Sequence, residues 1–287
     1  MKCSAYERVT SVESAMSAAA RYGDKTLFVA GATDVLIKAR EDQPYADRAL
    51  VDIADISELT DIREDHGHLH IGALCTHTQI AGDPLVNRYC GVLSQACATI
   101  GSPQIRNRGT IGGNIANASP AADTLPALAA LHATVHLLSP GGERTLPIAE
   151  VVQGAYKTSI RRGELITEIV VDQLAPEARQ RFYKVARRNA LAISRLTVAC
   201  SALTDSDGIV KDLRLALGSV FPSPIVFEEI NAHLVGKKPT QEGIAQVADL
   251  LSEKIPEIAG VRASTAYKQP VSRTMIFRGL AEVLEVK

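Results

Sequence analysis

The sequence predicts an α+β protein of two domains, and three observations support this fold class. The chain has 287 residues, of which 46% are apolar, enough for more than one packed unit. Short apolar segments typical of strands alternate with helix-like segments as far as residue 171. The polar segment 172–180, which contains Pro176, interrupts this pattern. We therefore expect domains at 1–175 and 176–287, the first made of lobes at about 1–57 and 58–175.

The first lobe is predicted to be a βαβ unit. Thr10 and Glu13 have the spacing of a capping box, which predicts a helix start, and Gly23 predicts the end of that helix. Apolar strand segments at 27–30 and 49–53 flank a helical segment at 34–40.

The second lobe is predicted to mix strands and helices around a turn at 65–67. The expected strands lie around Ile62 and at 69–71, 134–138 and 165–171, and the expected helices begin at Thr76, run from Pro84 through Ile100, and cover 125–131.

The C-terminal domain is predicted to place its strands before its helices. Asp205 and Gly208 bound a short turn that is a strong hairpin signal between two strands. The expected strands are 181–186, 194–204 and 209–218, and the expected helices are 226–235, 240–254 and 271–284.

The segment 101–114, G-S-P-Q-I-R-N-R-G-T-I-G-G-N, is the most informative motif of the chain. Gly112 and Gly113 let the backbone approach a charged ligand, and Thr110 and Asn114 add hydrogen-bonding groups. The alternative is a hairpin turn that needs positive φ, which explains the glycines but not Asn114 beside Thr110. We therefore favour a phosphate-binding segment.

A second turn of small residues follows the predicted strand at 27–30. Gly31, Ala32, Thr33 and Asp34 open the next helix, where free N–H groups and the positive end of the helix dipole can hold a pyrophosphate. Helix capping by Thr33 and Asp34 is compatible with this role. Neither segment matches G-x-x-x-x-G-K-[ST] or G-x-G-x-x-G, but two such turns together suggest a dinucleotide.

Composition argues against several other classes of protein. A formal net charge of -1 gives no long-range attraction to nucleic acid or to a membrane surface. The cysteines, at 3, 75, 90, 97 and 200, form no C-x-x-C pair and are odd in number, which argues against disulfides and an iron–sulfur cluster within this chain. The start of the chain lacks the apolar core of a secretion signal, and 125–138 is too short to span a bilayer. We expect a soluble, cytoplasmic chain.

Three alternating histidines, His66, His68 and His70, share one face of a predicted strand. An exposed hairpin is favoured over a metal site. No metal ligands are therefore expected, and no catalytic acid–base pair is evident.

At these motifs the chain resembles the FAD-binding medium subunits of molybdenum hydroxylases, such as xanthine, nicotinate and carbon monoxide dehydrogenases. The resemblance covers nearly the whole chain and rests on residues 30–34, 101–114, 119–123 and 182–187. Ala32 departs from the usual A-G-G-T-D of the family, in which a second glycine follows the first. Because alanine disfavours positive φ, this departure predicts a turn further from the ligand and weaker FAD binding.

The resemblance implies a fold and a set of FAD contacts. The fold is a two-lobed FAD-binding domain of the vanillyl-alcohol-oxidase/MurB-like type, followed by an α+β domain with a three-stranded antiparallel sheet and helices. It places Asp123 near the ribityl chain or ring, Lys184 at the isoalloxazine, and Ile166 against the ring. The alternatives are a helix cap for Asp123, a solvent-exposed strand-edge lysine for Lys184, and a core residue for Ile166. The implied contacts are Phe28, Val29, Ala30, Gly31, Ala32, Thr33, Asp34, Val35, Ile100, Gly109, Thr110, Gly112, Gly113, Asn114, Asp123, Ile166 and Lys184.

The function that the resemblance implies is electron transfer within a larger complex. FAD would accept electrons from the clusters of an iron–sulfur subunit and pass them to NAD+ or another acceptor, while a molybdopterin-containing large subunit hydroxylates the substrate. A self-sufficient FAD-dependent oxidoreductase acting on a small substrate is one alternative. A non-catalytic assembly module that has lost flavin is another, and Ala32 is its only sequence hint.

Overall fold

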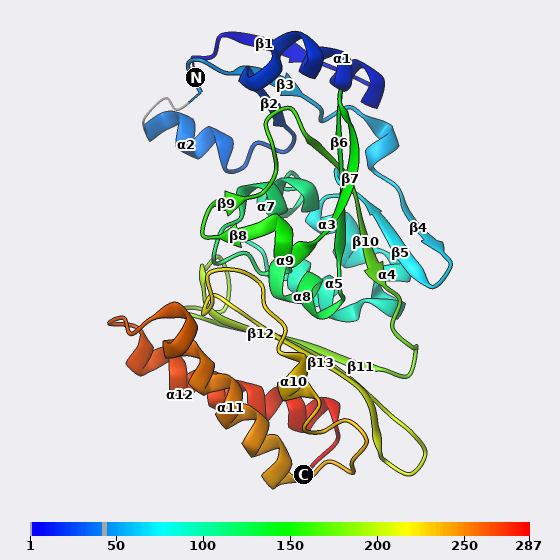
Figure 1. Cartoon of the computed structure of the whole chain (residues 1–287), viewed down its shortest axis with the longest axis vertical. Helices are drawn as coiled ribbons and strands as arrows, with labels where there is room; N and C mark the ends of the chain where they lie inside the picture. Colours follow the sequence, from blue (N-terminus) through cyan, green and yellow to red (C-terminus); the bar gives the residue numbers. More distant parts are fainter. Residues whose placement is uncertain (1, 42–44) are drawn as a thin grey trace.

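The first lobe is a small parallel sheet with helices, shown in blue at the top of Figure 1. The structure is a computed structural model that describes residues 2–41 and 45–287. The sheet order is β1-β3-β2. Its elements are β1 (Ala5–Arg8), α1 (Val12–Tyr22), β2 (Thr26–Val29), α2 (Val35–Glu41) and β3 (Ala49–Asp52), of which β1 was not expected.

The start of α1 corrects the predicted capping box. The cap is Ser11 rather than Thr10: its side chain accepts a hydrogen bond from the Ser14 N–H, and the Ser14 hydroxyl in turn accepts one from the Ser11 N–H. The box therefore lies one residue later than expected, with serine in place of Glu13 as its second partner. The predicted end at Gly23 is confirmed, since this residue has φ +54 and its N–H bonds the Ala19 carbonyl.

The second lobe contains a five-stranded sheet of order β4-β5-β10-β6-β7 and a group of short helices. The predicted helix from Pro84 through Ile100 is wrong as a single helix, because the chain breaks at Cys90 (φ -132, ψ +41) before Gly91. The strands are β4 (Ile62–Asp65), β5 (His68–Gly72), β6 (Thr134–Ser139), β7 (Gly142–Pro147), β8 (Val152–Gly154), β9 (Lys157–Thr158) and β10 (Leu165–Asp172). The helices are α3 (His77–Gly82), α4 (Pro84–Tyr89), α5 (Gly91–Ala98), α6 (Pro103–Arg106), α7 (Ile111–Asn117), α8 (Thr124–Ala130) and α9 (Ile148–Val151).

The C-terminal part packs two long helices against a sheet of three antiparallel strands, at the bottom of Figure 1. The predicted helix 226–235 is reduced to one turn, because Phe227 offers no capping side chain and turns follow Asn231. The elements are β11 (Arg179–Ala186), β12 (Ser194–Thr204), β13 (Val210–Gly218), α10 (Glu228–Asn231), α11 (Gln241–Ala259) and α12 (Thr265–Val283).

This three-stranded sheet is covered on both faces. One face packs on α11 and α12 and forms one apolar core. The other face meets α5 and α8, where Phe182, Ala199 and Ala216 join the core of the second lobe. Strand β12 is accordingly buried along most of its length. The second lobe and the C-terminal sheet therefore share apolar contacts.

Among the described helices, none has both the length and the apolar character needed to cross a membrane.

A charged cluster also joins the second lobe to the C-terminal part. Asp172, at the end of β10, accepts hydrogen bonds from Arg214 at 2.8 Å and from the His132 ring at 3.1 Å. The other ring nitrogen of His132 lies 3.3 Å from a carboxylate oxygen of Glu228. The bond to Asp172 raises the pKa of His132 above its ordinary value. An imidazolium at this position attracts two carboxylates, one on each side of the junction.

We predict that His132→Gln changes the pH dependence of stability. Since the folded state raises the pKa of His132, the charged ring stabilises the fold below about pH 6.5, and this contribution is lost as pH rises through the folded pKa. The free energy of unfolding of the variant should be lower than that of the original protein by roughly 0.2–1 kcal/mol at about pH 6, and by less at about pH 8.5. The effect is this small because the ring is partly exposed. Urea unfolding at both pH values measures this. An equal loss at both would contradict the prediction.

Candidate functional site between the first two lobes

The two glycine-containing segments meet at a backbone crossing. Gly31 follows β2, and a Cβ atom placed on it would lie 1.7 Å from the carbonyl oxygen of Arg108. No side chain fits there, so the turn of the first lobe and the approach to α7 in the second lobe touch through main-chain atoms. This contact is the arrangement that the dinucleotide interpretation requires.

The first turn offers unused hydrogen-bond donors. Among the hydrogen bonds of the described residues, none has the N–H of Gly31, Ala32, Thr33 or Asp34 as its donor. The carbonyls of Ala32 and Asp34 instead accept the first bonds of α2, from Leu36 and Lys38. Ala32 has φ +57, so it adopts the left-handed conformation that the usual glycine would take without strain. Free N–H groups at this turn suit an anion.

The second segment is the start of a helix, which corrects the alternative of a hairpin turn. Thr110 caps α7 by accepting a hydrogen bond from the Gly113 N–H at 3.1 Å. The N–H groups of Ile111 and Gly112 donate to the carbonyls of Cys75 and Ala73. These first-turn donors are therefore already used, and the free N–H groups of the site belong to the other turn.

The paired glycines of this helix have different roles. A Cβ on Gly112 would lie 2.8 Å from the Ala73 side chain, so this glycine is needed for packing against the residue after β5. A Cβ on Gly113 would approach only the Thr110 hydroxyl, at 2.9 Å, and Gly113 lines the space between the lobes. Gly113 is thus the glycine whose side-chain position is open to a ligand.

Two adjoining cavities lie beside the crossing, with volumes of about 630 and 230 Å³. They share lining residues, including Ala30, Thr110, Gly113 and Tyr156. The smaller one is lined by the predicted residues Phe28, Val29, Ala30, Gly31, Ala32, Thr33, Asp34, Val35, Gly109, Thr110, Gly113 and Asn114, and the larger one by Phe28, Ala30, Thr110, Gly112, Gly113 and Ile166.

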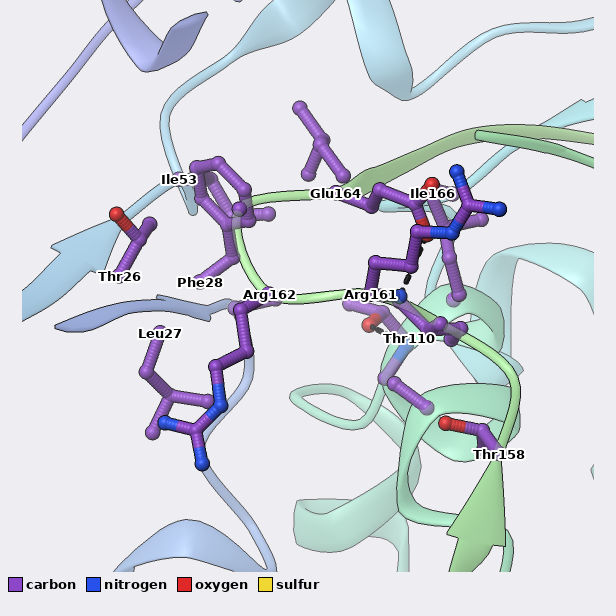
Figure 2. A pocket seen from close by; sticks show the side chains of 18 of the residues that line it. Thr26, Leu27, Phe28, Ile53, Thr110, Thr158, Arg161, Arg162, Glu164 and Ile166 are labelled. Carbon is purple, nitrogen blue, oxygen red and sulfur yellow. Dashed lines mark hydrogen bonds between the residues drawn. The ribbon is translucent and has the colours of Figure 1, made fainter. Parts of the chain in front are cut away.

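The larger cavity has apolar walls and a cationic edge. Figure 2 shows Phe28 and Ile53 on the first-lobe side and Ile166 on the second-lobe side. The loop that carries Arg161 and Arg162 runs between them. The Arg162 guanidinium donates to the Asp24 carbonyl at 3.1 Å, which ties this segment to the first lobe. Ile53, Arg161 and Arg162 were not predicted, because they follow no glycine motif and meet the site only through the fold.

A polar network closes the smaller cavity. Asn117 of α7 donates to the Asp34 carboxylate at 3.0 Å and accepts from the Lys38 ammonium at 2.7 Å. The same ammonium lies 5.0 Å from the centre of the Tyr156 ring. Sequence reasoning missed Lys38, Asn117 and Tyr156. Lys38 stands one helical turn after Asp34, and that i, i+4 spacing was the available signal.

Three predicted residues lie outside both cavities. Ile100 is half-buried, and its carbonyl accepts a hydrogen bond from Arg106 at 2.9 Å. Asp123 and Lys184 bind each other, with 2.6 Å between ammonium and carboxylate oxygen. The structure therefore does not bring Ile166 and Lys184 to one place, because Ile166 lines the larger cavity.

The Asp123–Lys184 pair joins the second lobe to the C-terminal sheet. Lys184 comes from β11 and also donates to the Thr99 carbonyl at 3.0 Å. Asp123 accepts further hydrogen bonds from the hydroxyls of Thr99 and Ser194. Burial raises the pKa of Asp123, and the Lys184 ammonium opposes that rise. Asp123 stands at the start of α8 but its side chain makes no capping hydrogen bond, so it does not act as a helix cap. Lys184 is only 14% exposed, so it is not a solvent-exposed lysine at a strand edge.

We predict that Lys184→Met destabilises the protein by about 3–5 kcal/mol, because it leaves a buried carboxylate without its cation. Adding Asp123→Asn should restore much of this loss, since the neutral amide no longer needs a counter-charge and still accepts from the two hydroxyls. Urea unfolding of both single variants and the double variant measures the coupling. A double variant no more stable than Lys184→Met would show that the pair is not the stabilising contact.

Comparison with known proteins identifies the family. The family model described as the FAD binding domain in molybdopterin dehydrogenase matches residues 2–173. The model of the CO dehydrogenase flavoprotein C-terminal domain matches residues 181–283. The first match covers more than half of the chain.

Relatives match over almost their full length. The nicotinate dehydrogenase FAD-subunit of Eubacterium barkeri is 31% identical over 260 residues, which are 90% of this chain and 88% of that protein. The carbon monoxide dehydrogenase medium chain of Hydrogenophaga pseudoflava is 31% identical, over 96% of this chain and 95% of its own.

Solved structures show the same fold. A carbon monoxide dehydrogenase from Hydrogenophaga pseudoflava superposes with a TM-score of 0.90 at 30% identity, covering 99% of this chain and 98% of that chain. Quinoline 2-oxidoreductase from Pseudomonas putida 86 superposes with a TM-score of 0.88 at 26% identity, covering 99% of each chain. The chain therefore belongs to the family of FAD-binding medium subunits of molybdenum hydroxylases, and its cofactor is FAD.

Proposed function

We propose that this chain holds FAD between its first two lobes and passes electrons from the clusters of an iron–sulfur partner subunit to NAD+ or another acceptor. The observation that carries the proposal is the crossing of Gly31 and Arg108, which puts the free N–H groups of residues 31–34 beside two joined cavities. The residues present fit a dinucleotide, because they combine anion donors with apolar walls.

The proposed contacts divide the cofactor between the two cavities. The N–H groups of residues 31–34 would bind the diphosphate, and the Lys38 ammonium adds positive charge there. Phe28, Ile53 and Ile166 line the larger cavity and suit an aromatic base. This assignment moves Ile166 from the flavin ring to the adenosine end of FAD.

Ile100, Asp123 and Lys184 remain proposed residues of the isoalloxazine end. The resemblance to the family supports this placement, and so does their connection to the second motif. Lys184 binds the Thr99 carbonyl, and Arg106 donates to the carbonyls of Ile100, just before that motif, and Gly101, its first residue. In this arrangement Asp123 holds the Lys184 ammonium in place by a direct ion pair.

FAD supplies the redox chemistry, since it can exchange electrons singly or in pairs. The chain's own part is to bind the cofactor, to fix its orientation between two lobes, and to keep one edge open to partners. We propose that the complex also contains a molybdopterin-containing large subunit, which carries out substrate hydroxylation.

The finer points of architecture are proposals as well. We propose domains at 1–175 and 176–287, with lobes at about 1–57 and 58–175, supported by the end of β10 at Asp172 and the start of β11 at Arg179. We propose the vanillyl-alcohol-oxidase/MurB-like type for the first domain, supported by the three-stranded sheet of its first lobe and the five-stranded sheet of its second lobe, with the site between the lobes. A cytoplasmic location is supported by the free thiols of Cys75, Cys90, Cys97 and Cys200, which are buried.

The cofactor site is tested by Gly113→Val. A branched side chain at this position would fill the space beside Thr110, so we expect the purified variant to lack flavin absorbance while its melting temperature stays within a few degrees of that of the flavin-free original protein. The control is Gly82→Val, because Gly82 is an exposed helical glycine with no atom within 4 Å of its Cβ position. A Gly113→Val variant that purifies with a full complement of FAD would refute the proposed site.

The acceptor is tested on the intact complex after anaerobic reduction. If NAD+ accepts the electrons, its addition should restore oxidised flavin absorbance and form at least one NADH for each flavin reoxidised, since the other reduced centres of the complex also supply electrons. If a quinone or a ferredoxin reoxidises the flavin and NAD+ does not, NAD+ is not the acceptor. That result would not change the proposed FAD site.

A further inference from the structure

A separate cavity of about 260 Å³ lies where the second lobe meets the C-terminal helices. Pro120 and Ala121 line it from the segment before α8, and Ser219 lines it from the segment after β13. Arg262 and Lys268 line it from the segment that joins α11 to α12 and from the first turns of α12. The cavity shares no lining residue with the two cavities proposed for FAD.

The charges at this cavity are all of one sign. Arg262 and Lys268 line it, and no Asp or Glu of the described residues does. Arg195 stands nearby, with its guanidinium 5.3 Å from the centre of the Tyr267 ring. Within residues 2–41 and 45–287, no salt bridge joins any of these three cations to a carboxylate.

These cations are close enough to influence one another. Burial lowers the pKa of Lys268, and the neighbouring charges of Arg262 and Arg195 lower it further. A half-buried ammonium beside two guanidinium groups is unfavourable unless an anion compensates it. The Lys268 ammonium uses one of its hydrogens on the Ser219 carbonyl at 2.5 Å, which leaves two for a ligand.

A neutral hydrogen-bond donor also belongs to a residue that lines this cavity. The Ser219 hydroxyl is buried and, among the described residues, has no hydrogen-bond partner. Ser219 also has φ +65, a left-handed conformation that a serine adopts only under constraint. Helix α12 is 19 residues long and starts here, and the Ser264 side chain makes no capping hydrogen bond. Its positive end therefore adds to the field of the three side chains.

We propose that this cavity binds the phosphate group of a small molecule through Arg262, Lys268 and the Ser219 hydroxyl, with Arg195 adding charge. Three cations without a carboxylate match a dianion better than the single charge of a carboxylate ligand. Guanidinium groups also bind phosphate oxygens in a bidentate manner. The site stands on these residues alone and does not depend on the bound flavin.

The cavity also touches the buried pair described above. Ser194 lines it, and the Ser194 hydroxyl donates to the Asp123 carboxylate, which holds Lys184. One hydroxyl thus separates the phosphate site from residues proposed to lie near the isoalloxazine.

The test uses flavin-saturated complex, so that the FAD site is filled. Calorimetric titration at constant ionic strength compares inorganic phosphate with acetate, and we expect phosphate to bind at least about tenfold more tightly. Arg262→Gln and Lys268→Gln should each weaken phosphate binding by about tenfold. Lys254→Gln is the matched control, because Lys254 pairs with Glu257 on α11 and lies outside the cavity. Flavin absorbance and melting temperature report folding and FAD binding of each variant independently.

The outcomes separate the hypotheses. Saturable phosphate binding that Arg262→Gln and Lys268→Gln weaken, and Lys254→Gln does not, supports the site. Absent phosphate binding, or an equal effect of all three substitutions, overturns it, even if every variant keeps its flavin. If Lys268→Gln fails to fold, the exposed Arg262 still decides the question. In a second titration, tighter binding of adenosine monophosphate than of phosphate identifies a phosphate ester as the ligand, and equal binding identifies the free ion.

Discussion

The site depends on one close approach of two main-chain segments. Because Gly31 has no side chain, the turn after β2 rests against the carbonyl of Arg108, and this contact brings the first lobe to the start of α7. The arrangement of the interlobe site depends on this contact. The residues of this turn, whose N–H groups have no hydrogen-bond acceptor among the described residues, line the smaller cavity. The Asp34–Asn117–Lys38 network links α2 to α7. A methyl group at residue 31 would separate the lobes.

A second junction holds the C-terminal sheet to the rest of the molecule. Here apolar contacts of Phe182, Ala199 and Ala216 combine with two carboxylates, Asp123 and Asp172, that each bind cations across the boundary. The combination explains why the sheet has no free face. Buried ion pairs add little net stability, but they require a defined geometry, so they set the orientation of β11 beside the second motif.

Local sequence signals predicted most of the elements, because capping residues, turns and apolar periodicity act over a few residues. The hairpin at Asp205 and Gly208 and the helix end at Gly23 are examples. Glycine chemistry also singled out the two segments that meet at the candidate site. The remainder depends on distant partners that no local pattern encodes: Gly112 packs on Ala73, Lys38 meets Asn117 across 79 positions, and Lys184 meets Asp123 across 61. The sheet order β4-β5-β10-β6-β7 has the same origin.

The left-handed conformation of Ala32 has a consequence for detecting such proteins. An alanine at φ +57 costs roughly 1–2 kcal/mol relative to an ordinary conformation, so the surrounding contacts, and not the preference of the residue itself, impose the shape of this loop. A glycine is then the easiest occupant of this position but not a requirement. Searches keyed to two successive glycines would therefore overlook chains that keep the same loop with a methyl group in it.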